Sequence, residues 1–173
     1  MDATVAALLI SALSLVLAGL SLGWQVAQWL LAGGRPRATL IHGLVDGNSV
    51  YSGRVKEGVP HDLSSLRRQG IIGTQVVGIR VTNHGRAPVS ISSVAVHTRG
   101  GALTLNPLGG LIGPSLPYQL LPGTNETWYV DAVDVAKLAS SSREVLNENV
   151  QGIYMTAALG TGKSIKTPEF LRA

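Results

Sequence analysis

The chain has 173 residues, a formal net charge of +4 and no cysteine. The lack of cysteine excludes a disulfide framework, a cysteine-ligated zinc site and a thiol nucleophile. Charged residues make up only 14% of the chain, against about 25% in an average soluble domain. This low charge, together with 45% hydrophobic residues, excludes ordinary intrinsic disorder and fits one modest folded domain.

The first expected element is a helix over the uncharged run 3–32. Residues 3–23 alone would rise about 32 Å as a helix, which is enough to cross a hydrocarbon core about 30 Å thick. The alternatives are a buried core helix and a cleaved signal peptide, which has a basic start and an apolar stretch of about 7–15 residues. Asp2 is the only charged residue before the run, so we expect an uncleaved transmembrane anchor with a juxtamembrane helix.

The residues around the end of this helix predict how it lies in a membrane. The expected membrane-interface residues are Trp24, Trp29, Arg35 and Arg37. Tryptophan favours the headgroup level, and basic residues favour the cytoplasmic side. All 14 Lys and Arg residues follow position 34. We therefore expect a single-pass protein of the cell membrane, with its N-terminus outside and residues 35–173 in the cytoplasm. An exported domain that faces outward is the alternative.

The basic residues are concentrated in the part of the domain nearest the helix. Residues 35–99 hold nine basic and three acidic residues. Anionic lipid attracts such segments, so the lipid bilayer is an expected partner. Nucleic acid is a weaker interpretation, because the basic residues are scattered and no known binding module is visible.

Small and polar residues of the helix share one face. The helix-association seam consists of Thr4, Ala7, Ser11, Ser14, Ala18, Ser21, Gln25 and Gln28. Their spacing alternates between three and four, which is the pattern of a helix–helix seam. Small residues let membrane helices approach, and their polar groups can bond across, so we expect a parallel homo-oligomer. Two alternatives stay open: a competing contact through Gly19 and Gly23, and serine hydroxyls that bond carbonyls of their own helix.

The rest of the chain predicts an all-β domain, 39–173, after a linker at 33–38. Strands are expected at 39–45, 75–82, 89–98, 102–105, 118–121, 127–130, 150–158 and 163–167, and short helices at 61–69 and 132–141. Short strands with turns at such intervals are typical of an antiparallel sandwich or barrel. Val89 and Ile91 have the opposite parity to Val94 and Val96, so a bulge at 92–93 is needed to bring all four into the core.

Two segments of this domain carry a family resemblance. The segment 81–91 reads Val-Thr-Asn-His-Gly-Arg-Ala-Pro-Val-Ser-Ile, and 121–123 reads Leu-Pro-Gly ahead of Trp128. Both resemble short sequence motifs of bacterial immunoglobulin-like modules. With the anchor, the chain is similar to membrane-anchored immunoglobulin-like β-sandwich proteins of bacteria or phages whose function is uncharacterised. The resemblance implies an antiparallel immunoglobulin-like sandwich that is a non-catalytic binding or scaffold domain, and it transfers no site residues.

The sequence offers little for catalysis or for a cofactor. The turn 160–164 is similar to a nucleotide-binding P-loop, but Ala157 stands where the motif has glycine and Pro168 interrupts the residues that follow. We therefore expect a hairpin turn and no nucleotide. The four histidines lack metal-ligand spacing, and no nucleophile–base set can be assembled. We expect no metal, no cofactor and no enzyme.

The segment 106–117 is a glycine- and proline-rich loop with large apolar residues. These are Leu108, Leu111, Ile112 and Leu116. Such side chains need cover, and two interpretations remain: they close the open end of the sandwich, or they form a contact patch for a partner or the bilayer.

These features favour a single-pass membrane protein whose β domain acts as a binding or scaffold module in a membrane-associated assembly, with an unidentified protein partner. The alternative is an oligomeric membrane-active protein, a pore-forming or lysis effector, that works through the polar seam of its helix. A leakage measurement separates the two.

Overall fold

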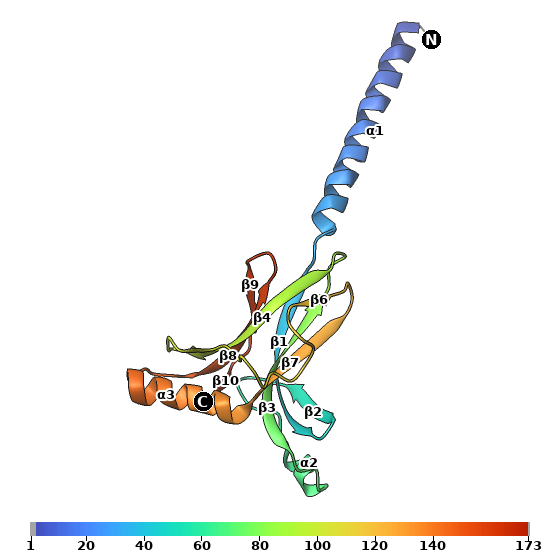
Figure 1. Cartoon of the computed structure of the whole chain (residues 1–173). Coiled ribbons are helices and arrows are strands. Elements are labelled where there is room, and N and C mark those ends of the chain that lie inside the picture. Colours follow the sequence, from blue (N-terminus) through green and yellow to red (C-terminus); the bar gives the residue numbers. More distant parts are fainter. Residues whose placement is uncertain (1–2, 173) are drawn as a thin grey trace.

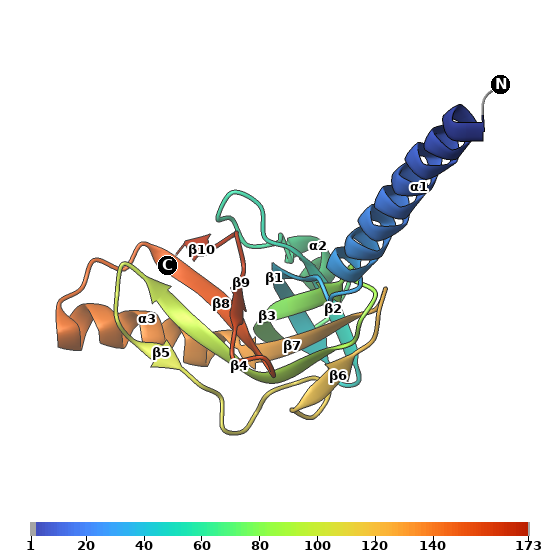
Figure 2. The same cartoon turned by 90° about the horizontal axis from the view of Figure 1, so that it is seen from above.

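The computed structural model describes residues 3–172 and has one long helix standing apart from a β domain (Figure 1). The helix α1 (Ala3–Leu31) continues through residues 32–35 into the first strand. Figures 1 and 2 show that α1 leaves the domain at one end and that the helix α3 (Ala132–Leu146) lies at the other. We call the end with α1 the proximal end and the end with α3 the distal end.

The first sheet has four strands in the order β2-β1-β3-β7. Their bounds are β1 (Pro36–Asp46), β2 (Ser49–Arg54), β3 (Thr74–Asn83) and β7 (Asn125–Asp131). The second sheet has the path β10-β8-β4-β5, with β6 paired to β4 and β9 to β8. Its strands are β4 (Val89–Arg99), β5 (Thr104–Leu105), β6 (Tyr118–Leu120), β8 (Gly152–Leu159), β9 (Ser164–Lys166) and β10 (Leu171–Arg172).

All pairings between these strands are antiparallel. The mostly β organisation with an apolar N-terminal helix is therefore as expected from the sequence.

The core lies between the two sheets and follows the period-two pattern of the sequence. Val77, Ile79 and Val81 of β3 are buried on one face, while Arg80 on the other face is exposed. Burying a side chain of this kind contributes about 1.5–3 kcal/mol. Trp128 of β7 is fully buried, and its indole Nε1 donates to the carbonyl of Pro114 at 2.9 Å.

The expected bulge in β4 is confirmed. The pairing of β4 with β8 shifts register between Ile91 and Ser93. The core then receives Val89, Ile91, Val94 and Val96 from this one strand. An extra residue on one strand reverses its parity, so both halves of β4 can face inward.

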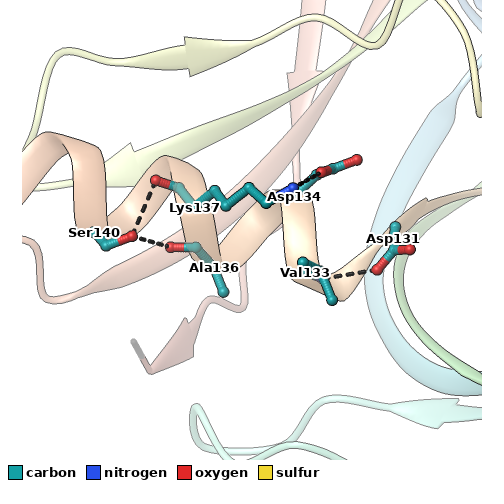
Figure 3. A network of polar contacts seen from close by, with 6 residues as sticks. All are labelled: Asp131, Val133, Asp134, Ala136, Lys137 and Ser140. Carbon is teal, nitrogen blue, oxygen red and sulfur yellow. Dashed lines mark hydrogen bonds and ion pairs between the residues drawn. The ribbon is translucent and has the colours of Figure 1, made fainter.

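Asp131 caps α3, as the sequence predicts (Figure 3). Its carboxylate accepts the backbone N–H of Val133 at 2.8 Å. Farther along, Lys137 donates to Asp134 at 3.1 Å and the Ser140 hydroxyl bonds the carbonyl of Ala136 at 3.0 Å. The helix extends to Leu146, beyond the expected end at 141, because contacts hold its last turn: the buried Ser142 hydroxyl bonds the carboxylate of Glu148.

Other element boundaries differ from the expectations. The strand β2 lies in a stretch, 46–72, that the sequence indicates as mostly loop. It is a short edge strand with an exposed pattern, held by pairing to β1. The helix α2 (Ser64–Arg68) is shorter than 61–69. Asp62 does not occupy its N-cap position but accepts the backbone N–H of Ser64 at 2.9 Å.

Candidate functional site at the proximal end

The helix α1 carries the strongest functional signal. Its stretch Ala3–Trp29 is long and apolar enough to cross a membrane, and none of it is buried in the domain. Leu8, Leu15 and Leu22 are each about two-thirds exposed or more. A helix that packs in a soluble core would bury such side chains. The apolar surface of this helix is instead left to be covered by something outside the domain, such as a lipid bilayer or another helix.

The residues of the helix-association seam are all exposed along α1. The hydroxyl of Ser11 donates to the carbonyl of Ala7 at 2.9 Å, and that of Ser14 to Ile10 at 2.8 Å. These are the bonds within one helix that the sequence leaves open as an alternative. A hydroxyl that donates its proton in this way keeps lone pairs that can accept a bond from a neighbouring helix. Association through the seam therefore stays a prediction.

The membrane-interface residues lie where the helix meets the domain. Trp24 and Trp29 are exposed on the last turns of α1. Arg35 follows the helix, and Arg37 is the second residue of β1, so the expected linker 33–38 is partly strand. Both arginines are exposed.

A buried asparagine ties this junction to the domain, and sequence reasoning missed it. Asn83 is fully buried at the end of β3. Its Oδ1 accepts the backbone N–H groups of Arg35 at 3.1 Å and Gly85 at 3.0 Å. Its Nδ2 donates to the carbonyls of Ala87 at 2.8 Å and Leu120 at 3.3 Å. The amide thus uses both donors and accepts twice, which satisfies a buried asparagine side chain.

Backbone bonds reinforce the same junction. The N–H of His84 donates to the carbonyl of Arg35 at 3.0 Å, and that of Arg86 to Gly33 at 3.3 Å. A Cβ on Gly85 would lie 2.4 Å from the Gly33 carbonyl oxygen, so glycine is required for this close approach. The Asn-x-Gly pattern is the sequence signal for this junction. It does not by itself reveal the junction, because asparagine and glycine are common in turns of every kind.

The apolar residues of the loop 106–117 do not act as one surface. Leu111 and Leu116 pack against the core, as closure of the sandwich requires. Ile112 is 39% exposed and exchanges backbone hydrogen bonds with Tyr129 at the open edge of β7. Leu108 is fully exposed. A contact patch for a partner could therefore use Leu108 and part of Ile112.

The segment 160–164 forms the expected hairpin turn between β8 and β9. The N–H of Leu159 donates to the carbonyl of Lys163 at 2.7 Å, and β9 then pairs with β8. No helix opens after the turn, so the helix N-terminus that a P-loop places at its phosphate is not formed. Among residues 3–172, no three His, Cys, Asp or Glu side chains converge as a metal site.

A small cavity lies at the distal end. It has a volume of about 250 Å³ and is lined mainly by apolar side chains, among them Val77, Val135 and Ile153. His42 is buried at its wall, with Nδ1 3.3 Å from the carbonyl oxygen of His61. Burial lowers the pKa of His42 below its ordinary value, because the charged imidazolium loses hydration.

The proximal end therefore combines an exposed apolar helix with a junction held by a buried asparagine. Comparison with known proteins adds no relative: no family model, no curated protein and no solved structure matches this chain.

Proposed function

We propose that this chain is a single-pass membrane protein whose β domain acts as a binding or scaffold module on the cytoplasmic face of the membrane. The observation that carries the proposal is the exposed, apolar α1 joined to the domain without a free linker. Within the connection 32–35, the carbonyls of Gly33 and Arg35 accept hydrogen bonds from the β3–β4 turn, which restricts how the domain can turn relative to the helix. Such a joint suits a domain that must present one surface at a set height above a bilayer.

We further propose that the domain is immunoglobulin-like, and the strand order supports this. The immunoglobulin fold sets strands A, B and E of one sheet against C, F and G of the other. In chain order, β1, β3 and β7 take the A, B and E places, and β4, β8 and β9 take the C, F and G places. In this chain β2 extends the first sheet, β5 and β6 pair with β4, and α3 fills the connection between the E and F places.

Binding modules of this type act through surface contacts, and the chain offers exposed edges for them. The strand β2 is the outer strand of the first sheet, with Val50 and Tyr51 both over a third exposed. An outer strand has backbone donors and acceptors that a partner strand can meet. We place the protein partner at this domain and the second copy of the chain at the seam of α1.

Photo-crosslinking in native membranes tests the proposal. A photoreactive residue is placed at Tyr51 on β2, at Leu108 in the loop 106–117, or at Val16 on α1. We expect Tyr51 or Leu108 to give a discrete product with a different protein, and Val16, on the face of α1 opposite the seam, to give none. Crosslinks only between copies through α1, together with leakage of vesicles that hold the purified chain, would instead support the membrane-active alternative.

A further inference from the structure

Basic residues from three separate parts of the chain meet at the proximal end. Arg35 and Arg37 lie where the chain enters β1, Arg86 lies in the β3–β4 turn and Lys163 lies in the β8–β9 turn. We call these four residues the basic rim. Figure 1 shows both turns and the start of β1 at the end of the domain from which α1 leaves. The sequence places these residues up to 128 positions apart, so only the fold makes them one surface.

The positions of the rim residues are fixed by backbone bonds. The N–H of Arg86 donates to the carbonyl of Gly33 at 3.3 Å, which holds the β3–β4 turn against the base of α1. The N–H of Gly160 donates to the carbonyl of Ser90 at 2.8 Å, which holds the β8–β9 turn beside the start of β4. The rim therefore keeps its shape when the domain lies close to another surface.

The charges of the rim side chains are exposed to solvent and are not neutralised by the ion pairs that the structure describes in the domain. All four are exposed. Within residues 3–172 the side-chain ion pairs are Arg54–Glu169 and Lys137–Asp134, and neither includes a rim residue. Among the described residues, the acidic side chain at this end is that of Glu126, the second residue of β7, whose carboxylate accepts from the hydroxyl of Tyr118 at 3.5 Å. The proximal end is thus strongly basic.

The length of α1 brings the rim close to the headgroup layer. Its 29 residues rise about 43 Å, against about 30 Å of hydrocarbon. With Ala3 at one edge of the hydrocarbon, Trp24 reaches the other edge after about 32 Å, and the last turns cross the headgroup layer. Residues 32–35 then lead directly into β1, so the rim follows the headgroup layer closely in the chain. Charges interact across about 8 Å at physiological ionic strength, so a small tilt of the domain would bring the rim into range.

We propose that the basic rim docks the β domain onto an anionic bilayer surface, with Arg86 and Lys163 binding lipid phosphates beside Arg35 and Arg37. The proposal rests on α1 spanning the bilayer, and it adds a second contact that fixes the tilt of the domain. Each basic residue close to an anionic surface strengthens docking about fivefold. The fixed tilt would present the distal end and the outer strand β2 to partners at a constant height.

Fluorescence quenching in nanodiscs tests this proposal with the full chain. The chain has no cysteine, so a single dye can be attached at Thr161→Cys beside Lys163, or at Asn48→Cys in the distal β1–β2 turn. A quencher is carried by the lipid headgroups, in discs of phosphatidylcholine alone or mixed with phosphatidylglycerol. We expect Thr161 to be quenched more strongly in the anionic discs than in the neutral ones, the difference to shrink as salt is added, and Asn48 to stay unquenched in both.

Charge-removing variants make the test specific. Arg86→Gln with Lys163→Gln should lower the ratio of docked to undocked chains by on the order of 25-fold. The matched control, Arg67→Gln with Arg68→Gln on α2, also removes two exposed charges and should leave quenching unchanged. Equal melting curves for both variants show that folding is intact. Equal quenching in the two lipid mixtures, or an unaffected rim variant, overturns the proposal.

Two further measurements distinguish docking to the bilayer from binding of a free anion and from a helix that does not span. If inorganic phosphate relieves the quenching at Thr161 more than chloride does at equal ionic strength, the rim binds a free anion. That result would overturn docking to the bilayer. A dye at Leu15→Cys reports on the span itself, through a quencher on the acyl chains. If Leu15 stays in water, both the span and the docking proposal fail. If Leu15 is quenched but Thr161 is not, only the docking proposal fails.

Discussion

The side-chain oxygen of Asn83 accepts the backbone N–H of Arg35 at 3.1 Å, across 48 positions of sequence. Through this bond, the last residue before β1 is held by the last residue of β3. The same amide group also holds Gly85, Ala87 and Leu120, so one buried side chain joins the base of α1 to both sheets. The direction of the domain relative to α1 depends on it.

Replacing this side chain should destabilise the domain. Asn83→Ala leaves two backbone N–H groups and two carbonyls without their partner at a buried position. We expect a loss of at least about 4 kcal/mol in unfolding free energy, because four groups lose their partner and each buried unsatisfied group costs about 1–3 kcal/mol. Denaturant unfolding of the full chain in detergent measures this. Asn48→Ala, in the exposed β1–β2 turn, is the control and should change stability by less than about 0.5 kcal/mol.

The close approach at Gly85 gives a second prediction. A methyl group there would lie within 2.4 Å of backbone atoms of Gly33 and Arg35, so Gly85→Ala must push the β3–β4 turn away from the junction. We expect a clear fall in melting temperature, together with faster proteolysis between α1 and β1. Gly109→Ala adds the same methyl group where nothing lies within 4 Å and should leave both unchanged. Equal behaviour of the two variants would contradict the tight junction.

One buried and one half-buried histidine predict how stability depends on pH. Burial lowers the pKa of His42 and of His97 below 6.5. Between each lowered pKa and 6.5 the unfolded chain binds more protons than the folded one, so stability rises with pH there and falls on acidification. We expect the unfolding free energy to decline as the pH drops below about 6.5. In His42→Gln this decline should be smaller, and a decline of wild-type size would show that His42 does not contribute.

The seam of α1 predicts self-association in membranes. Replacing Ser11, Ser14 and Ser21 together with Leu removes the small and hydroxyl-bearing contacts, so we expect weaker association in a membrane two-hybrid assay. Leu9→Ala, on the face of α1 opposite the seam, is the control and should associate like the wild type. If the triple variant associates normally and Gly19→Ile abolishes association, the interface is the glycine face instead.

Much of the β domain could be predicted from local patterns. Alternation located β3 and β8, and the parity change in β4 predicted its bulge, because side-chain direction follows the backbone with period two. The strand β2 was missed because an edge strand with both faces exposed has no such alternation. Ser52, expected in a loop, lies in β2 with its hydroxyl 3.1 Å from that of Tyr129.

The junction could not be predicted for a different reason. The role of Asn83 depends on partners at positions 35, 87 and 120, which only the folded chain brings together. In the sequence it is an ordinary turn asparagine, two residues before a glycine. The basic rim is hidden in the same way, since Arg86 and Lys163 each look like a solvated turn residue. The apolar run of α1, by contrast, is a local property and is visible directly.

The topology of the chain is the most direct test of the central claim, which places the β domain in the cytoplasm below a single spanning helix. Asn48→Cys provides one thiol in the exposed β1–β2 turn of an otherwise cysteine-free chain. A membrane-impermeant maleimide should leave this thiol unlabelled in intact cells and label it after permeabilisation. Efficient labelling in intact cells would contradict the claim, because it would place the domain outside.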